Sequence, residues 1–142
     1  QLIEHGDVGA AIETALPVTD VDVLMGAGGL PEGYLAAVAL RALGGSIVQK
    51  LFFKNDDDRA DFVQRSQAMG FSEQVIKESQ ERIWWDHDLV TGDSFVALTG
   101  VTDGPIVKGV HFRGDVIETH SLVARSTSGT VRLIETWHQL NA

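Results

Sequence analysis

The sequence predicts an α/β protein with a mixed β-sheet flanked by helices. Helical and strand patterns alternate through the first half of the chain, and strand patterns dominate the second half. The alternation predicts parallel pairing in part of the sheet. With 142 residues, 44% of them hydrophobic, the chain can bury one core, so we expect a single domain over residues 1–142.

The first half begins with a short amphipathic helix over residues 9–16. Residues 21–25 are a short apolar run with two β-branched valines, which predicts a strand buried on both faces. A helix over residues 32–43 follows, because Pro31 presets the helical φ in the first turn, and two glycines end it. Residues 46–53 are rich in β-branched and aromatic side chains and form the next expected strand.

The second half contains a solvated helix and then strands. The acidic run at residues 56–58 favours a capped helix start rather than a metal site, and Gly70 ends that helix. Asp103 and Gly104 predict a turn, and residues 127–129 predict the turn of a hairpin. The expected strands lie at residues 94–98, 106–112, 116–125 and 130–140.

A glycine loop precedes the second helix and contains Gly26, Gly28 and Gly29. Its backbone can approach a ligand closely, and a helix start favours an anion such as phosphate. Neither nucleotide fingerprint fits, because Leu30 interrupts the dinucleotide spacing and no lysine follows the glycines. Glu32 therefore suggests a divalent cation between its carboxylate and a phosphate. Alternatively, Glu32 only stabilises the helix dipole, by about 0.3 to 1 kcal/mol.

A series of motifs covers most of the chain in an order that resembles one enzyme family. The motifs stand at residues 14–17, 21–33, 39–45, 68–70, 98–104, 119–123, 125–126, 128–132 and 134–135. The sequence resembles the GlpX-type, class II fructose-1,6-bisphosphatases, including the bifunctional fructose/sedoheptulose bisphosphatases. The resemblance implies a fold similar to the carboxyl-terminal domain of the lithium-sensitive phosphatase superfamily.

The resemblance also implies an activity. The complete enzyme would hydrolyse the 1-phosphate of fructose 1,6-bisphosphate with Mg²⁺ or Mn²⁺, in gluconeogenesis, with sedoheptulose 1,7-bisphosphate as a second candidate substrate. Glu32 matches the family's metal-ligand glutamate, and Gly29 matches a glycine that contacts substrate through its backbone. Family members are roughly twice this length, and their amino-terminal half supplies most metal-binding carboxylates. We therefore expect a carboxyl-terminal domain that lacks confident catalytic residues of its own.

His5, Gly6 and Asp7 align with a substrate-binding Asp-Gly-Asp motif of the family, with His5 in place of the first aspartate. Asp7 can accept hydrogen bonds from sugar hydroxyls, while His5 changes the charge and the donors at its position. Asp7 can also serve as the N-cap of the helix that follows it. A stand-alone, non-catalytic sugar-phosphate binding module with the same fold is the alternative to the enzyme.

Several other groups are predicted to be structural. Residues 84–88 contain tryptophans, aspartates and a histidine that favour a packing anchor over a metal cluster. Ser121 and Ser126 lack a nucleophile-elbow pattern. Residues 99–104 match a family hallmark to which the sequence assigns only a turn. The histidines on expected strands are also predicted to be structural: His111, His120 and His138.

Composition limits the classes of molecule that the protein is expected to bind and its expected cellular location. A net charge of −9 disfavours nucleic acids and anionic membranes, and the absence of cysteine excludes thiol catalysis. No apolar run approaches the ~20 residues that span a bilayer. We expect a cytoplasmic protein. We also expect a homo-oligomer, because a domain without its amino-terminal half would expose apolar residues.

Overall fold

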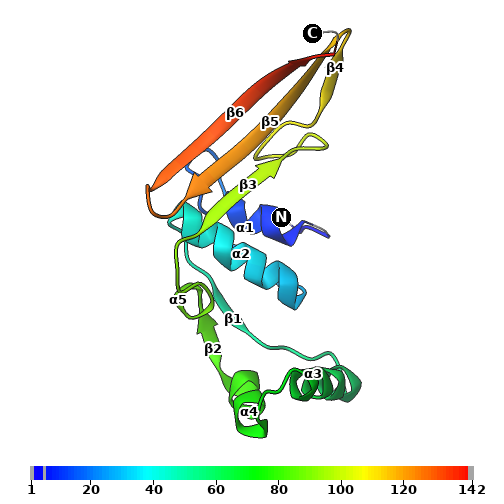
Figure 1. The fold of residues 1–142 in the computed structure, drawn as a ribbon, viewed down its shortest axis with the longest axis vertical. Coiled ribbons are helices and arrows are strands. Elements are labelled where there is room, and N and C mark those ends of the chain that lie inside the picture. The colour runs from blue at the N-terminus through cyan, green and yellow to red at the C-terminus, as the bar shows by residue number, and fades with distance from the viewer. Residues whose placement is uncertain (1, 5, 141–142) are drawn as a thin grey trace. The chain divides into compact units, whose positions relative to one another are not determined.

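The computed structural model describes residues 2–4 and 6–140 (Figure 1). The chain divides into two compact units. The first comprises residues 1–47 and 86–142, and the second comprises residues 48–85. The predicted α/β class is confirmed, since helices flank two β-sheets, one in each unit. None of the helices in the described part of the chain has the length and apolar character that crossing a bilayer requires.

The sheet of the first unit is built around one long central strand. Its strands are β3 (Phe95–Thr99), β4 (His111–Arg113), β5 (Val116–Arg125) and β6 (Thr130–Gln139). β6 pairs with β5 along its full length, as the predicted hairpin requires. β3 and β4 follow one another along β5, with Thr99 opposite Ser121 and His111 opposite Glu118. Every pairing is antiparallel.

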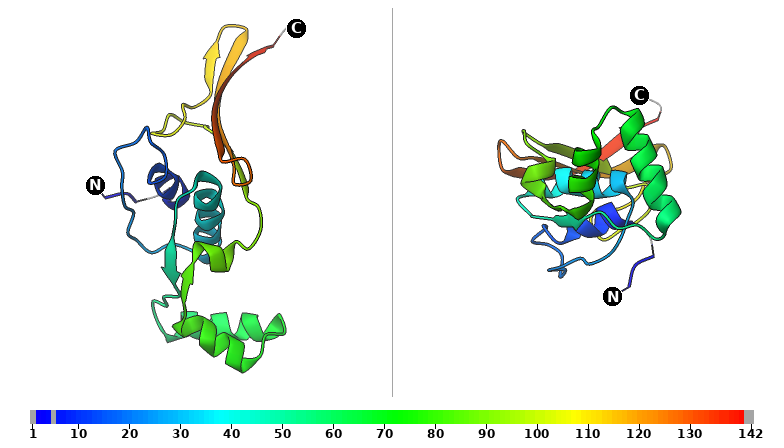
Figure 2. Two further views of the ribbon diagram at one scale, coloured as in Figure 1. Left: turned by 90° about the vertical axis from the view of Figure 1, so that its left-hand side faces the viewer. Right: turned by 90° about the horizontal axis from the view of Figure 1, so that it is seen from below.

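Two helices pack together and cover part of this sheet (Figures 1 and 2). They are α1 (Asp7–Glu13) and α2 (Leu30–Leu43), and the single-turn helix α5 (Asp86–Leu89) lies against α2. The main core joins helix residues to the central strand and consists of Ile12, Leu16, Ala39, Ala42, Leu122 and Ala124. Gly44 ends α2 in the left-handed conformation, with φ of 81°, as predicted for this glycine.

The predicted strand at residues 21–25 is wrong. The segment from residue 21 to residue 29 is neither helix nor strand, and Val23 and Met25 are 71% and 90% exposed. An apolar run can form a strand only where a neighbouring strand takes up its backbone hydrogen bonds. Within the described residues, β5 is paired with β3, β4 and β6, and none of these contacts involves the 21–25 segment.

The predicted parallel pairing is also wrong. After α2 the chain does not return to the first sheet but enters the second unit at β1 (Val48–Lys50). β1 pairs antiparallel with β2 (Ile83–Trp85), so the described part of the chain contains no strand-helix-strand crossover. The expected strand over residues 46–53 is reduced to the three residues of β1.

The second unit also contains two helices, α3 (Asp56–Ala68) and α4 (Glu73–Glu81). Asn55 caps α3 by accepting a 2.8 Å hydrogen bond from the Asp58 amide, which confirms the predicted capped and solvated helix start. Gly70 follows the helix with φ of 87°, as expected for its role in ending it. α4, capped by Ser72, was not predicted from the sequence.

The hallmark segment at residues 99–104 forms part of a tightly closed loop between β3 and β4. A Cβ at Gly100 would overlap the carbonyl oxygen of Lys108, and a Cβ at Gly109 would come within 2.7 Å of the Thr102 backbone. The Asp103 carboxylate accepts a 2.8 Å hydrogen bond from the Gly109 amide. These glycines are therefore required because two backbone segments touch, which gives the hallmark a structural role.

Candidate functional site

The structure brings the predicted substrate-binding and metal-binding segments together. Asp7 opens α1, and its carboxylate lies against Gly28, where a Cβ would stand 2.6 Å from Oδ2. Glu32 lies in the first turn of α2, and its carboxylate lies so close to Gly29 that a Cβ there would displace it. Two carboxylates from two helices thus lie over neighbouring glycines of the loop.

Packing of the two helices produces this arrangement. Ala11 of α1 and Ala36 and Leu40 of α2 form a small buried cluster between the helices. Alanine side chains allow helix axes to approach closely, so the first turn of α1 comes beside the loop that leads into α2. The link between sequence and site is therefore the small-residue contact between α1 and α2.

Gly6 has a conformational reason to be glycine. It precedes α1 with φ of 89°, in the left-handed region that L side chains rarely adopt. Gly6 is the N-cap residue and Asp7 is the first helical residue, so the alternative interpretation of Asp7 as the N-cap is wrong. Its charge remains favourable to the helix dipole. His5 lies outside the described residues.

The N-cap of α2 offers no side chain to the first-turn amides. Gly29 is the N-cap in an extended conformation and has no side chain to accept hydrogen bonds from the first-turn amides. Pro31 stands in the first turn, as the sequence predicts. Glu32 is exposed, so its carboxylate is accessible both to solvent and to an ion.

These residues fit part of a divalent cation site. The two carboxylates face a backbone without side chains, and hard cations such as Mg²⁺ bind carboxylate oxygens. Within the described residues, however, one set of three possible ligands meets within 4.8 Å, and Glu32 is not in it. Glu32 and Asp7 therefore account for a fraction of a complete coordination shell.

The set of three possible ligands lies on the sheet and was not predicted from the sequence. It consists of Glu118 and His120 on β5 and Glu135 on β6, and we call it the β5–β6 triad. Nε2 of His120 lies 2.8 Å from Oε1 of Glu118, and Nε of Arg113 donates to Oε2 over 2.7 Å. The hydrogen bonds from His120 and Arg113 hold the pKa of Glu118 below its ordinary value, against the effect of burial.

A signal for the triad is present in the sequence. Residues 118 and 120 alternate onto one face of a strand, and the hairpin turn fixes which residues of β6 lie opposite. The hairpin was predicted, but its register was not assigned. With the observed register Glu135 stands directly across from His120.

Other polar groups have structural partners. Oδ1 of Asp103 accepts a 2.8 Å hydrogen bond from the Gly109 amide and lies 2.9 Å from Nε2 of His111. The Gly109 hydrogen bond first, and then the His111 contact, hold the pKa of Asp103 below its ordinary value. The hydroxyl of Ser126 accepts a 2.8 Å hydrogen bond from the Ser94 amide. The buried carboxylate of Asp86 accepts a 2.8 Å hydrogen bond from the Ser46 hydroxyl, which gives this residue a structural role. Trp85, part of the predicted packing anchor, is 46% exposed.

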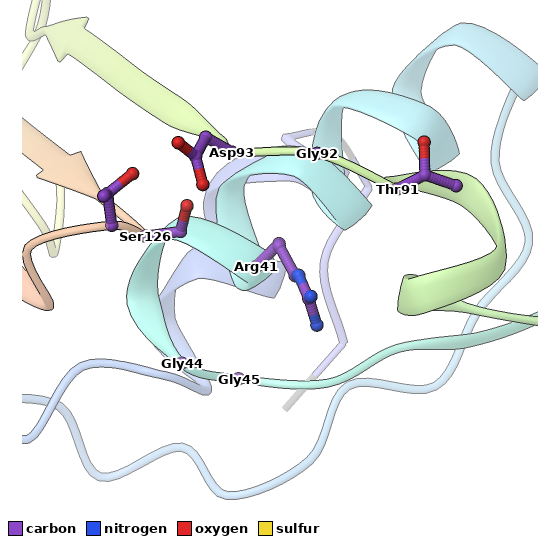
Figure 3. Close-up of a pocket in the computed structure, with 8 residues that line it drawn as sticks. Arg41, Gly44, Gly45, Thr91, Gly92, Asp93 and Ser126 are labelled. Carbon is purple, nitrogen blue, oxygen red and sulfur yellow. The ribbon is translucent and has the colours of Figure 1, made fainter.

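A cavity of about 460 Å³ lies at the carboxyl-terminal end of α2. Figure 3 shows residues that line it. Arg41 and Asp93 bring opposite charges to it, and Arg41 also lies 3.5 Å from buried Asp86. The lining contains none of the residues predicted for substrate or metal binding. The complete lining is Arg41, Gly44, Gly45, Thr91, Gly92, Asp93, Ser126 and Thr127.

Comparison with known proteins identifies the family. Residues 1–138 match the family of bacterial, glpX-encoded fructose-1,6-bisphosphatases. The chain is 34% identical to the class 2 fructose-1,6-bisphosphatase of Haemophilus influenzae over 149 aligned positions, which cover 98% of this chain and 43% of the relative.

Two relatives carry a double name, D-fructose 1,6-bisphosphatase class 2/sedoheptulose 1,7-bisphosphatase. The protein from Acaryochloris marina is 33% identical over 99% of this chain and 42% of its own length. The protein from Trichormus variabilis is 33% identical over 97% of this chain and 41% of its own length. The chain thus spans less than half the length of these relatives and matches their carboxyl-terminal part. It belongs to the GlpX-type, class II fructose-1,6-bisphosphatase family.

Proposed function

We propose that this chain forms one side of the active site of a metal-dependent sugar bisphosphatase. The reaction is hydrolysis of the 1-phosphate of fructose 1,6-bisphosphate, and sedoheptulose 1,7-bisphosphate is the second candidate substrate. The observation that carries the proposal is the placement of the Asp7 carboxylate against Gly28 and of the Glu32 carboxylate against the neighbouring Gly29. Relatives named for these two activities support the choice of substrate.

Each residue of the site has a distinct proposed role. Glu32 would hold Mg²⁺ or Mn²⁺, which supplies positive charge for the phosphate oxygens in the transition state. Gly29 would offer its backbone to the substrate at the amino-terminal end of α2, where free amides and the helix dipole favour phosphate. Asp7 would accept hydrogen bonds from sugar hydroxyls, with Gly6 fixing the turn that presents it. His5 would adjust substrate preference.

The proposal requires further ligands. Magnesium needs near-octahedral oxygen coordination, which one firm carboxylate cannot provide. The remaining carboxylates would come from an amino-terminal domain like that of the longer relatives, and the assembled protein would be a cytoplasmic homo-oligomer. The exposed apolar side chains of Val23, Met25 and Leu30 beside the glycine loop are suited to contact with such a domain.

The test is a complete enzyme in which this chain is fused to a matching amino-terminal half from the family, with Glu32→Gln as the variant. Glutamine keeps nearly the same volume and removes the charge, so turnover should fall on the order of 10²- to 10³-fold. The free energy of unfolding should change by about 0.3 to 1 kcal/mol, the size of the dipole interaction.

Glu73→Gln is the matched control, because Glu73 is also an exposed first-turn glutamate, in α4. It should show the same small change in stability and normal turnover. If Glu32→Gln kept near-normal turnover at saturating metal, Glu32 would be only a helix-stabilising residue. A fusion that bound sugar phosphate but had no activity with intact Glu32 would favour the non-catalytic binding module.

A further inference from the structure

The β5–β6 triad combines three donors that suit a metal ion. The ligand atoms of Glu118, His120 and Glu135 all lie within 4.8 Å of one another. Metal–ligand bonds of about 2.0 to 2.2 Å place neighbouring ligand atoms roughly 3 to 3.5 Å apart. At 2.8 Å, Nε2 of His120 and Oε1 of Glu118 lie slightly closer than this spacing, so a small separation of the two side chains would admit an ion. Exposed Glu135 can complete the set by rotating its side chain.

The backbone fixes the positions from which these side chains project. Glu118 and His120 alternate on β5, and the antiparallel ladder places Glu135 of β6 opposite His120. Both strands are ten residues long, and the pairing is continuous from Val116 to Arg125. The triad is therefore held by a rigid ladder rather than by a loop, which is the arrangement that preorganises a ligand site.

The triad lies apart from the site at Glu32. It shares the sheet face of Leu122 and Ala124, which pack against the helices, but is placed further toward the start of β5. Figures 1 and 2 show that this end of β5 and β6 extends beyond α1 and α2. Glu32 stands on α2, so an ion at the triad would not be the ion of the proposed active site.

The side chains around the triad leave part of its negative charge uncompensated, which favours a cation. The Glu118 side chain is only 7% exposed, and its carboxylate accepts a 2.7 Å hydrogen bond from Nε of Arg113 and lies 2.8 Å from Nε2 of His120. Glu135 adds a second carboxylate, whose Oε1 accepts a 2.9 Å hydrogen bond from Trp137. Arg113 balances only one of the two negative charges. Outer hydrogen bonds of this kind commonly orient metal ligands.

We propose that the β5–β6 triad binds a divalent transition-metal ion, with Nε2 of His120 and one oxygen each from Glu118 and Glu135 as protein ligands. An imidazole with two carboxylates favours ions from Mn²⁺ to Zn²⁺ over Mg²⁺ and Ca²⁺, which prefer all-oxygen sites. The ion would replace the direct contact between Nε2 of His120 and Oε1 of Glu118, and a proton held between these atoms would pass to solvent. It would join β5 to β6 beyond the helix-covered core and stabilise that end of the hairpin.

The test is calorimetric titration of the 142-residue chain with Zn²⁺, repeated in excess Mg²⁺, together with thermal unfolding. We expect one Zn²⁺ per chain, little competition from Mg²⁺, and a rise in Tm, because a ligand that binds the folded state stabilises it. His120→Ala and Glu135→Gln should each weaken binding by about tenfold or more and reduce the rise in Tm. Glu135 is exposed, so its variant should remain folded.

Two variants serve as controls. His138→Ala removes an exposed histidine of β6 whose ring is bonded to Thr119, and Glu32→Gln removes the proposed active-site ligand. Both should bind Zn²⁺ as the unchanged chain does. The proposal is overturned if the unchanged chain does not bind Zn²⁺, if folded His120→Ala and Glu135→Gln bind it normally, or if Glu32→Gln alone abolishes binding.

Discussion

The carboxylate of Asp7 lies against the backbone of Gly28, although α1 and a long irregular segment separate the two residues in the sequence. Gly28 has no left-handed φ, so its backbone could accept a side chain. A Cβ at this position would stand 2.6 Å from Oδ2 of Asp7, so the flexible carboxylate would have to move away. The glycine therefore allows the two predicted substrate-binding segments to meet.

Gly28→Ala tests this contact in the complete, fused enzyme. The new methyl group should displace the flexible end of Asp7 and raise KM for the sugar bisphosphate, while the free energy of unfolding changes by less than about 0.5 kcal/mol. Gly26→Ala is the control, because a Cβ at Gly26 meets no atom within 4 Å. Equal KM values for the two variants would contradict a role for Asp7 in substrate binding.

The isolated chain should show no measurable fructose 1,6-bisphosphatase activity with Mg²⁺ or Mn²⁺. Glu32 belongs to no set of three ligands within the described residues, and a catalytic magnesium needs several oxygen ligands shared with substrate. Phosphate release is the measurement. Release that co-purifies with the chain and disappears in Glu32→Gln would show that the chain is catalytically sufficient.

Gly100→Ala should destabilise the protein by about 1 to 3 kcal/mol, because its Cβ would be forced into the carbonyl oxygen of Lys108, a backbone atom that cannot swing away. Gly104→Ala belongs to the same loop, but its Cβ would make only an ordinary 3.6 Å contact with Val107. Its effect should stay within about 0.5 kcal/mol. Urea unfolding of both variants measures the difference, and equal midpoints would refute the packing argument.

Acid should weaken the sheet of the first unit. The native pKa of Glu118 is lowered first by His120, and that of Asp103 first by the Gly109 amide. Folding therefore favours the ionised forms of both carboxyl groups. The stability that they contribute is fully present at pH values above their ordinary pKa values of ~4.3 for Glu and ~3.9 for Asp. This stability is lost as the pH falls below the ordinary pKa values toward the lower pKa values of the folded protein.

The measurement is the urea midpoint between neutral pH and about pH 3, the range that contains both ordinary carboxyl values. Glu118→Gln should lower the midpoint at neutral pH and flatten its decline in acid. Glu73→Gln, on an exposed helix start of the second unit, should leave the decline unchanged. If the urea midpoint of Glu118→Gln fell in acid as steeply as that of the unchanged chain, protonation of Glu118 would not be a cause of the acid sensitivity.

The isolated chain should self-associate. Val23 and Met25, in the segment that leads into α2, and Leu30, the first residue of α2, are each more than half exposed. Exposed apolar groups of this kind usually find a partner. Light scattering over a range of concentrations measures this. Replacing Met25 by Gln should shift the chain toward monomer, whereas a strict monomer at high concentration would argue against the prediction.

Much of the site was predictable because its residues are close in sequence. Gly29, Pro31 and Glu32 belong to one helix start, and the sequence signals of a helix start can be recognised without the tertiary structure. The same holds for the end of α2 at Gly44 and for the hairpin of β5 and β6, where a turn joins two strands directly. Local propensity and short-range hydrogen bonds decide such features.

Tertiary structure decided the rest. Residues 21–25 have the composition of a buried strand, yet a strand depends on a partner that local sequence does not specify, and none pairs with it within the described chain. The contact of Asp7 with Gly28 depends on how α1 packs against α2, and the β5–β6 triad depends on a register that places Glu135 opposite His120. Sequence by itself determined the family, the helix starts and the glycine loop. Long-range packing and strand register decided which side chains meet, because those contacts join residues that no local interaction connects.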